Sequence, residues 1–321
     1  WDVKKANIFK NKKKFFDGYK NPLGVISYSS SFHGKISKKN FLKKVYTHNK
    51  IDNAIVYHWK QFYNLENDWG FCIPKEKLKK ITNNDEIFIE LETIKKSNTM
   101  KVFDLYLKGK SDNEILFFAH SCHSSQANDD ASGISVMLKI YEKLKKQKNK
   151  KFSYRFIIAP EIYGPLFWLD KLKKDKISKI RGCIKLAAVG NNDILKLQKS
   201  YNGNSFLDKI FENIAQNKNN KLITGKFRKI YGNDEIVFEA PKYSIPTISF
   251  TRVKKRPLEE YPEYHTNLDN IDIIFDSKLN HTVNIVMKGL SVLENNQYII
   301  PKFSGLPKLS NPKYNLFLNV H

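Results

Sequence analysis

The pattern of apolar and polar positions changes near residue 100, and the longer part of the chain after it alternates strand-like and helix-like segments. The run EILFFA at 114–119 is apolar enough for a strand buried on both faces. In SGISVMLKIYEKLKK, at 132–146, apolar residues recur at spacings of three and four, which predicts an amphipathic helix. Further strands are predicted at MKVFDLYL, YRFIIAP, CIKLAAV and IPTISF, and further helices at NSFLDKIFENIAQN and LNHTVNIVMKGLSVLEN. We expect an α/β fold in which MKVFDLYL is an edge strand and EILFFA a central strand of a largely parallel or mixed sheet, with helices on both faces.

The first part of the chain shows a different pattern, in which short runs of alternating apolar and polar residues are separated by turn-rich segments. The strings VISYSSSF, at 25–32, and FIEL, at 88–91, predict antiparallel strands. We therefore expect a small β-rich subdomain over 1–95, an α/β domain over 96–300 and a loop-rich C-terminal extension over 301–321. Aromatic residues of the first part are expected to pack in its core or at an interface; these are Tyr57, Trp59, Phe62, Tyr63, Trp69 and Phe71.

Composition narrows the function classes. The chain has 321 residues, 41% of them hydrophobic, so it can bury a full core. Its formal net charge of +24 is large, but the lysines are spread along the chain beside asparagines and no nucleic-acid-binding motif accompanies them. We expect no specific nucleic-acid partner. Three scattered cysteines indicate a reducing compartment, and no apolar run approaches the roughly 20 residues of a membrane span, so the expected location is cytoplasmic.

Ionisable side chains gather where three of the predicted segments end. Glu161 directly follows YRFIIAP, His265 lies in the polar string EEYPEYHTNLD, and the loop after EILFFA holds His120, Cys122, His123, Asp129 and Asp130. Loops at the carboxyl ends of sheet strands are where α/β proteins bind ligands. Imidazole and carboxylate ligands suit Zn²⁺, and a further carboxylate could act as a base beside it.

Each of these residues also has an ordinary structural explanation. A histidine in a polar loop is often a surface residue or one with satisfied hydrogen bonds. Asp129 and Asp130 could cap the following helix, because Asp is favoured at that position. Glu161 could be a solvated turn residue. The pattern alone leaves these explanations open beside the metal site.

The strings HSCHSSQANDDASG, PEIYG and YHTNLD, in this order, resemble the signature series of the zinc aminopeptidase clan that contains bacterial leucyl aminopeptidase and glutaminyl cyclase. The resemblance is closer to a bacterial branch of aminopeptidase-like proteins encoded among polysaccharide or flagellar-glycan biosynthesis genes. In that branch a Cys-His pair precedes an Ala-Asn-Asp segment. The likeness continues through WDVKKANI, VISYSSSFHGKIS, WGFCIP, SYNGN, GNDEIVFEAP and YPEYHTNLDN. It implies a three-layer, zinc-exopeptidase-like fold.

The resemblance also implies roles for individual residues. It makes Asp129 and His265 zinc ligands and Glu161 the general base. The leucyl aminopeptidase pattern would select His120 as the other histidine ligand, whereas the closer branch selects His123. We expect His123.

Two departures from the clan concern the second metal of its dinuclear enzymes. Ile162 stands where those enzymes have a carboxylate after the base, and Ala187 or Ala188 stands where they have an aspartate. The terminal ligands of a second metal are therefore missing. We expect one Zn²⁺ per chain, held by His123, Asp129 and His265, with water completing a tetrahedron.

Four further residues are candidates for binding the substrate: Asp234, Glu235, Arg252 and Tyr264. Asp234 could orient a ligand histidine, Arg252 could clamp a carboxylate, and Tyr264 could stabilise an oxyanion. For each of these four residues, an ordinary ion pair or packing contact is an equally good explanation. The implied function is a zinc-dependent amide hydrolase, with a small peptide or an N-acyl amino sugar as substrate. The alternative is a catalytically weakened aminopeptidase-fold protein that binds a glycan or another protein.

Overall fold

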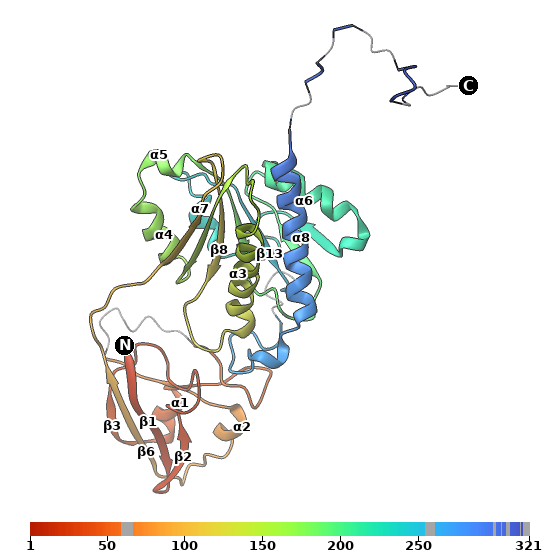
Figure 1. Cartoon of the computed structure of the whole chain (residues 1–321). Helices are drawn as coiled ribbons and strands as arrows, with labels where there is room; N and C mark the ends of the chain where they lie inside the picture. Colours follow the sequence, from red (N-terminus) through yellow and green to blue (C-terminus); the bar gives the residue numbers. More distant parts are fainter. Residues whose placement is uncertain are drawn as a thin grey trace.

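The computed structural model describes residues 1–58, 67–253, 261–297, 300–302, 304–305, 309–314 and 316. An N-terminal β-rich unit lies beside a larger α/β unit, and the chain passes from the first to the second after strand β6 (Ile87–Ile94). Figure 1 shows the larger unit above and the N-terminal unit below it.

The N-terminal unit is built on a four-stranded antiparallel sheet in the order β2-β1-β6-β3. The other strands of this sheet are β1 (Asp2–Lys10), β2 (Lys13–Asp17) and β3 (Phe32–Ile36). A parallel pair, β4 (Val45–Tyr46) and β5 (Phe71–Cys72), and two short helices, α1 (Lys38–Leu42) and α2 (Lys75–Leu78), complete the unit. Its core includes the fully buried Ile8, Phe41, Phe71 and Ile89.

The larger unit contains a seven-stranded mixed sheet in the order β12-β11-β13-β10-β8-β9-β7. Its strands are β7 (Phe103–Leu107), β8 (Glu114–His120), β9 (Ser153–Ala159), β10 (Ile180–Leu186), β11 (Leu195–Gln198), β12 (Leu222–Gly225) and β13 (Thr247–Thr251). Four adjacent strands, β13, β10, β8 and β9, run parallel, and β7 and β11 pair antiparallel with this group. The carboxyl ends of the four parallel strands therefore meet at one edge of the sheet.

Helices cover both faces of this sheet. The long helices α3 (Ser132–Lys145), α6 (Phe206–Gln216) and α8 (Asp276–Asn295) pack on one face, with Ile115 and Phe117 of β8 in their core. The shorter α4 (Tyr163–Asp170) and α7 (Glu235–Phe238) pack on the other, against Leu116 and Phe118. The remaining elements are the short helix α5 (Lys174–Ile177) and three single-turn segments, η2 (Ala127–Ala131), η3 (Lys218–Asn220) and η4 (Ile271–Ile273). Figure 1 shows the resulting three layers.

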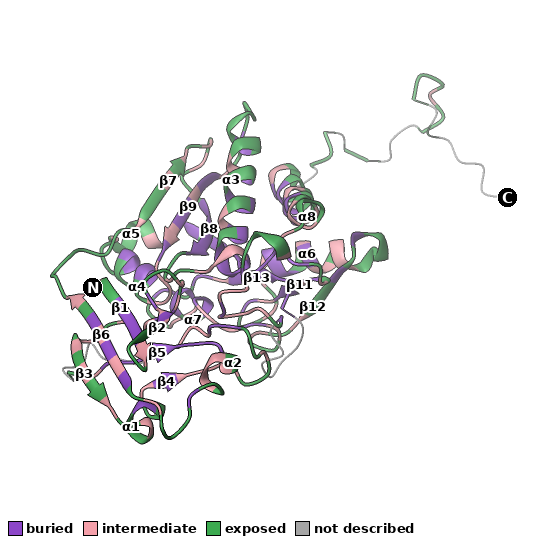
Figure 2. Cartoon of the chain, turned by 90° about the horizontal axis from the view of Figure 1, so that it is seen from below, coloured by how far each residue is buried: buried purple, intermediate pink, exposed green. Residues whose placement is uncertain are grey.

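Burial explains the apolar runs of the sequence. All seven residues of β8 are buried, because the strand lies inside the sheet with a helix layer on each side. Helix α3 instead buries one stripe, formed by Val136, Met137, Ile140 and Leu144, and leaves the opposite side exposed. Figure 2 shows buried residues concentrated along the central strands and exposed ones on the outer sides of α3 and α8.

The expected fold class is confirmed: a mixed sheet flanked by helices, with a small β-rich unit before it. The edge position of β7 and the inner position of β8 also agree with expectation. The strand predicted over 25–32 is wrong, since the described strand begins only at Phe32. Tyr28 has a left-handed φ of 63°, and the Ser29 hydroxyl donates to the Ile26 carbonyl at 2.7 Å, so the chain turns there.

The predicted aromatic packing is found for Trp69 and Phe71, which are buried in the core of the N-terminal unit. Trp59, Phe62 and Tyr63 lie outside the described residues, as does part of the expected extension over 301–321. Where that extension is described it contains neither helix nor strand.

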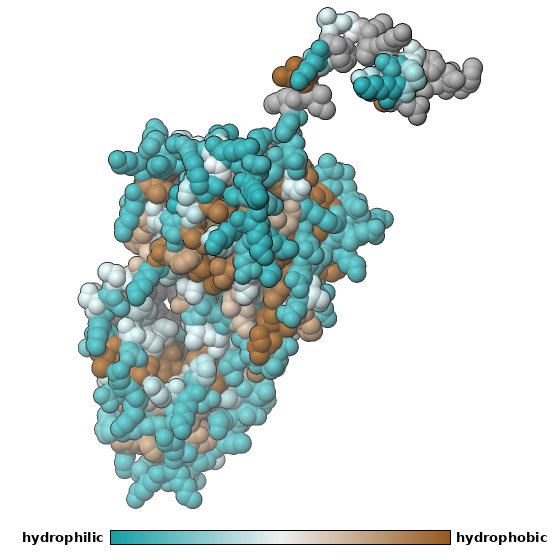
Figure 3. All heavy atoms as spheres, viewed as in Figure 1, coloured by the Kyte–Doolittle hydropathy of each residue, from teal (hydrophilic) through white to brown (hydrophobic). Residues whose placement is uncertain are grey.

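Hydrophilic residues cover most of the face seen in Figure 3, and apolar ones form smaller patches on both units. Among the described helices, none has both the length and the apolar character that crossing a membrane requires.

Candidate metal centre

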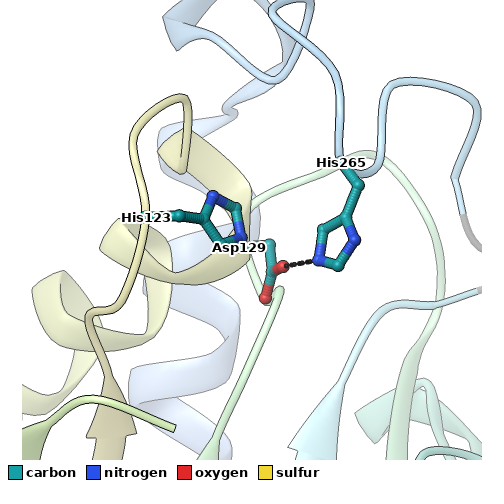
Figure 4. A group of neighbouring side chains, drawn as sticks. All are labelled: His123, Asp129 and His265. Carbon is teal, nitrogen blue, oxygen red and sulfur yellow. Dashed lines mark ion pairs between the residues drawn. The ribbon is translucent and has the colours of Figure 1, made fainter. Parts of the chain in front are cut away.

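Three potential metal ligands converge where the carboxyl ends of the parallel strands meet. His123 comes from the loop after β8, Asp129 from η2, and His265 from the loop between β13 and η4. One ligand atom from each lies within 4.8 Å of the other two. Figure 4 shows the two imidazoles on either side of the carboxylate, with His265 Nε2 3.3 Å from Asp129 Oδ2. These are the three ligands expected from the resemblance, and the structure brings them together.

Hydrogen bonding leaves a metal-binding nitrogen free on His123. Its Nδ1 donates to the carbonyl oxygen of Ser124 at 2.7 Å, which requires the proton on Nδ1 and leaves the Nε2 lone pair available. Burial, reinforced by the neighbouring His265, lowers the pKa of His123 and favours the neutral form that binds metals.

Another buried carboxylate, that of Asp269, fixes the backbone that carries the Asp129 side chain. Asp269 accepts hydrogen bonds from the backbone N–H groups of Asn128, at 2.6 Å, and Asp129, at 3.1 Å. The Tyr261 hydroxyl donates to the same carboxylate at 2.8 Å. Asp269 thus links the loop that carries His265 to the segment that carries Asp129, and fixes the spacing of two ligands.

The neighbouring Asp130 has a structural role. Its Oδ1 accepts from the backbone N–H of Gly133 and of Ala188, both at 3.1 Å, and its Oδ2 accepts from that of His120 at 3.2 Å. It therefore holds β8, the residues after β10 and the start of α3 together. This role is close to the capping of the following helix that the sequence had left open for Asp130. Burial, with the adjacent Asp129 carboxylate, raises the pKa of Asp130 to about 7.

His120 lies beneath the three ligands and is fully buried. Its Nε2 is 2.9 Å from Asp129 Oδ1, and its Nδ1 is 3.6 Å from Asp130 Oδ2 and 3.8 Å from Asp234 Oδ2. Burial alone would lower its pKa, but Asp130 and Asp129 outweigh that effect and raise it to about 10. His120 thus supports Asp129 from the side opposite His265.

A second group of potential ligands, His120, Glu161 and Asp234, lies beside the first. Burial, reinforced by the Asp234 carboxylate, raises the pKa of Glu161, as suits a group that must accept and then release a proton. The Cys122 thiol lies next to it, with Sγ 4.0 Å from Glu161 Oε2.

Aromatic rings enclose the two ligand imidazoles. Tyr57 of the N-terminal unit stacks on His123 with ring centroids 4.1 Å apart, and Tyr264 stacks on His265 at 3.9 Å. The Tyr57 backbone N–H also donates to the His265 carbonyl at 2.6 Å. The N-terminal unit therefore forms one wall of the centre.

Two of the predicted substrate-binding residues belong to a buried ion pair. Asp234 and Glu235 are both 0% exposed, and the Lys185 ammonium lies 3.2 Å from Asp234 Oδ2 and 3.9 Å from Glu235 Oε2. Asp234 also accepts from the Ile162 backbone N–H at 2.6 Å. It faces His120 rather than one of the three converging ligands.

Arg252 has a structural position that differs from the expected carboxylate clamp. It is 1% exposed, and its guanidinium donates to the carbonyl oxygens of Val189, at 2.9 Å, and Lys278, at 3.0 Å. One NH2 group also lies 3.0 Å from His281 Nδ1. Burial lowers its pKa to about 10. These partners occupy the N–H groups of the guanidinium. Arg252 therefore joins the end of β13 to α8 and is not available to a substrate. Of the four candidates, Tyr264 alone contacts one of the three converging ligands.

The positions expected to have lost the second metal's ligands provide backbone hydrogen bonds and apolar packing. Ile162 and Ala188 bind Asp234 and Asp130 through their N–H groups, and Ala187 is buried among apolar residues. Ile162, Ala188 and the ligand His265 all have left-handed φ angles, between 51° and 61°. Strained backbone of this kind is concentrated at functional sites.

Sequence reasoning missed three residues of this region. Tyr57 was expected only to pack. Its ring contact with His123, 66 positions later in the chain, leaves no local signal in the sequence. Asp269 lies inside the YHTNLDN string and could have been noticed there. Lys185 carries a clearer signal, because it is a charge within the apolar string CIKLAAV, and a buried charge requires partners.

The three converging ligands fit Zn²⁺ by donor type. Two imidazole nitrogens and a carboxylate oxygen form a set that zinc accepts in enzymes while keeping a position for water or substrate. The hydrogen bond from His123 Nδ1 to a carbonyl is the outer contact that orients a ligand histidine.

The chain as a whole is similar to known proteins. A family model described as "Domain of unknown function (DUF4910)" matches residues 23–296. A protein of Clostridium acetobutylicum, named as a candidate polysaccharide biosynthesis protein with an aminopeptidase-like domain, is 27% identical over 298 residues. The match covers 92% of this chain and 66% of that relative, so this chain spans slightly less than two thirds of its length.

Solved structures show the same fold. A candidate peptidase from C. acetobutylicum superposes with a TM-score of 0.81 at 26% identity, covering 95% of this chain and 71% of that one. A zinc aminopeptidase from Bacillus subtilis gives 0.66 at 16% identity, covering 91% and 82%. A glutaminyl cyclase from Porphyromonas gingivalis gives 0.50 at 17% identity, covering 64% and 78%. The chain therefore has the zinc-exopeptidase fold expected from its motifs.

Proposed function

We propose that this chain, which belongs to the DUF4910 family, is a mononuclear zinc-dependent hydrolase of amide bonds. The observation that carries the proposal is the convergence of His123, Asp129 and His265 within 4.8 Å, with the half-buried Glu161 close by. The zinc-exopeptidase fold supports it, because solved structures of this fold include a candidate peptidase and a zinc aminopeptidase.

The residues of the site have distinct parts in the proposed reaction. When bound, Zn²⁺ would polarise the amide carbonyl and lower the pKa of the attacking water. Glu161 takes a proton from that water as the water oxygen bonds to the carbonyl carbon. Glu161 then gives the proton to the amide nitrogen as the carbon–nitrogen bond breaks, so the products are a carboxylic acid and an amine.

The walls of the site suit a small substrate. Tyr57 and Tyr264 stack on the ligand imidazoles and limit access from the N-terminal unit and from the β13–η4 loop. We propose a small peptide or an N-acyl amino sugar as the substrate. The name of the C. acetobutylicum relative, with its reference to polysaccharide biosynthesis, supports the sugar.

The proposal is tested by Glu161→Gln. This variant should lose at least about 10²-fold in kcat, because a positioned general base contributes roughly 10² to 10⁴, while it still binds one zinc per chain. Activity would be followed on a panel of aminoacyl anilides and N-acyl amino sugars, and metal content by elemental analysis. Glu142→Gln, at an exposed salt-bridged site on α3, is the matched control and should retain full activity. Full activity of Glu161→Gln would refute its assigned role.

A second candidate function is binding of a glycan or a protein without catalysis. Ile162 and Ala187, where the clan has carboxylates, favour this alternative. The half-buried Glu161 carboxylate, with its raised pKa, opposes it, because a binding protein has no need of such a base. A zinc-loaded wild-type chain that binds sugars or peptides and turns none of them over would support the alternative.

A further inference from the structure

A buried cation, the Lys185 ammonium, lies against the second group of potential ligands. Among the described residues, three of the buried side-chain atoms without a hydrogen-bond partner are His120 Nδ1, Asp234 Oδ2 and Lys185 Nζ. These atoms face one another, since Asp234 Oδ2 lies 3.8 Å from His120 Nδ1 and 3.2 Å from Lys185 Nζ. Buried polar atoms rarely lack a hydrogen-bond partner, so this cluster calls for a functional explanation.

Lys185 reaches the cluster from within the sheet. It lies on β10 between Cys183 and Ala187, on the side of the sheet that carries the α4 and α7 layer. Its side chain is 0% exposed, and its ammonium lies 4.6 Å from the centre of the Tyr231 ring. A lysine is almost never fully buried unless it is paired, and its closest partners here are the carboxylates of Asp234 and Glu235.

The charges around this ammonium match those expected for a cation site. Asp234, Glu235 and Glu161 place three carboxylates around it, and the two that it pairs with are completely buried. Arg228 lies 3.8 Å from Glu235, but its side chain is 47% exposed. Among the described residues, Lys185 is therefore the buried ammonium that faces these carboxylates.

We propose that the Lys185 ammonium serves as the second cation of the site and prevents a divalent metal from binding to His120, Glu161 and Asp234. This inference rests on the proposed function, because it presumes one zinc at His123, Asp129 and His265. A zinc ligated by Asp234 would lie about 2 Å from its carboxylate oxygen. That oxygen is 3.2 Å from the ammonium, so the two cations would repel each other in a buried pocket.

The consequence for chemistry concerns Glu161. A metal in the second group would take a Glu161 oxygen as a ligand, and that oxygen could then no longer accept the proton of the attacking water. Lys185 supplies the positive charge without using Glu161. Ile162 and Ala187 add no carboxylate to this region, and Lys185 supplies an ammonium, so the site would hold one metal and one ammonium.

The test is the metal content of Lys185→Met. The wild-type chain and the variant are freed of metal, titrated with Zn²⁺ and with Co²⁺, and measured by calorimetry and elemental analysis after dialysis. We expect one metal per wild-type chain and two per variant chain, with the second site at least 100-fold tighter in the variant. Lys196→Met, which removes a lysine from β11, a strand separated from β10 by β13, is the matched control and should bind one. Lys185→Met with Asp234→Asn should also bind one, because the new site loses a ligand.

The possible outcomes separate this inference from the proposed function. One metal in both the wild-type chain and a folded Lys185→Met variant would overturn the inference alone. A wild-type chain that binds a second metal within tenfold of the first affinity would also overturn it, and this measurement needs no variant. A wild-type chain without a metal site would refute both proposals. If Lys185→Met unfolds when metal-free, recovery of its structure with two metals bound supports the inference, and failure to recover overturns it.

Discussion

At the scale of single residues, burial and hydrogen bonding separate two histidines that the sequence could not distinguish. His120 is 1% exposed, and its ring faces the carboxylates of Asp129, Asp130 and Asp234. His123 is partly exposed, and within the described part of the chain its ring makes one hydrogen bond, through Nδ1, which leaves Nε2 free. The two residues are three apart, but the strand ends between them, so they enter different environments. His123 is accordingly the better candidate for the ligand.

This difference predicts unequal effects of substitution. His123→Ala should lower zinc affinity by at least about 10³-fold, because a direct ligand is removed. His120→Asn should lower it by roughly 10- to 100-fold, as expected for a residue that orients a ligand from outside the first layer of contacts. Competition with a chromophoric chelator measures both affinities. A larger loss in His120→Asn than in His123→Ala would reverse the assignment.

A second prediction at this scale follows from the position of His281. Burial, reinforced by the Arg252 cation, lowers its pKa from the ordinary value of 6.5. The folded chain therefore takes up this proton less readily than the unfolded chain. The contribution of His281 to stability is complete above pH 6.5 and is lost as the pH falls through that value, because the unfolded state is protonated first.

Urea unfolding at pH 7 and pH 5 tests the His281 prediction. His281→Gln lacks the titrating ring, so its free energy of unfolding should fall less between the two pH values than that of the wild-type chain. Equal losses in the two proteins would contradict the assigned pKa shift.

The residue scale also shows what sequence reasoning can reach. The three proposed ligands and Glu161 were found because they lie in short strings with known relatives. Arg252 was misjudged because an arginine after a strand looks the same in sequence whether it faces a cleft or the carbonyl of Lys278. Lys185 received no role, since its partners lie about 50 positions away and depend on the packing of α7.

At the scale of elements, the strand–loop–helix unit from β8 to α3 depends on one close approach. A Cβ atom on Gly133 would lie 2.3 Å from Asp130 Oδ1 and 2.6 Å from the Leu186 carbonyl oxygen. Both neighbours are fixed, because Asp130 bonds to backbone on either side of the junction. The first turn of α3 can therefore pack against β10 only with glycine at this position.

Gly133→Ala is accordingly predicted to destabilise the fold by about 2 kcal/mol, within the usual range for overpacking a well-filled site. Chemical denaturation followed by circular dichroism measures the change. Ser135→Ala, on the exposed side of the same helix, is the control and should change stability by less than about 0.5 kcal/mol. A stable Gly133→Ala variant that keeps its zinc affinity would show that the junction can relax.

Regular elements were predictable to the extent that their periodicity was strong. The strands at β8 and β9 and the helices α3, α6 and α8 follow from apolar runs or helical spacing in single segments. Strands β1 and β2 were not identified as such, because DVKKANIFK and KKFFD mix lysine with apolar residues and are stabilised by pairing with β6. The local turn at Tyr28, not an unfavourable composition, interrupts the strand expected over 25–32.

At the scale of the whole molecule, the proposed centre joins segments that are far apart in the chain. Its ligands lie at positions 123, 129 and 265, and Tyr57 of the N-terminal unit covers one of them. A short bridge between Val56 and Thr266 connects the same two regions. A metal held there would cross-link the loop after β8 to the loop after β13, next to the contact between the two units. Neither the contact nor its position at the site could be seen in the sequence, because each depends on the docking of separately folded segments.

This arrangement predicts that zinc stabilises the folded chain as a whole. A ligand that binds only the native state adds about 2.7 kcal/mol at a free concentration of 100 times its Kd, and for a chain of this size that corresponds to a rise of roughly 5 °C in Tm. Differential scanning calorimetry with a zinc buffer, and again with excess chelator, measures the difference. His265→Asn is the matched control, because asparagine tolerates the left-handed φ of 53° at this position while weakening the metal site, and its Tm should respond little to zinc. Equal shifts in the wild-type chain and in His265→Asn would place the stabilising metal elsewhere and would contradict the proposed centre.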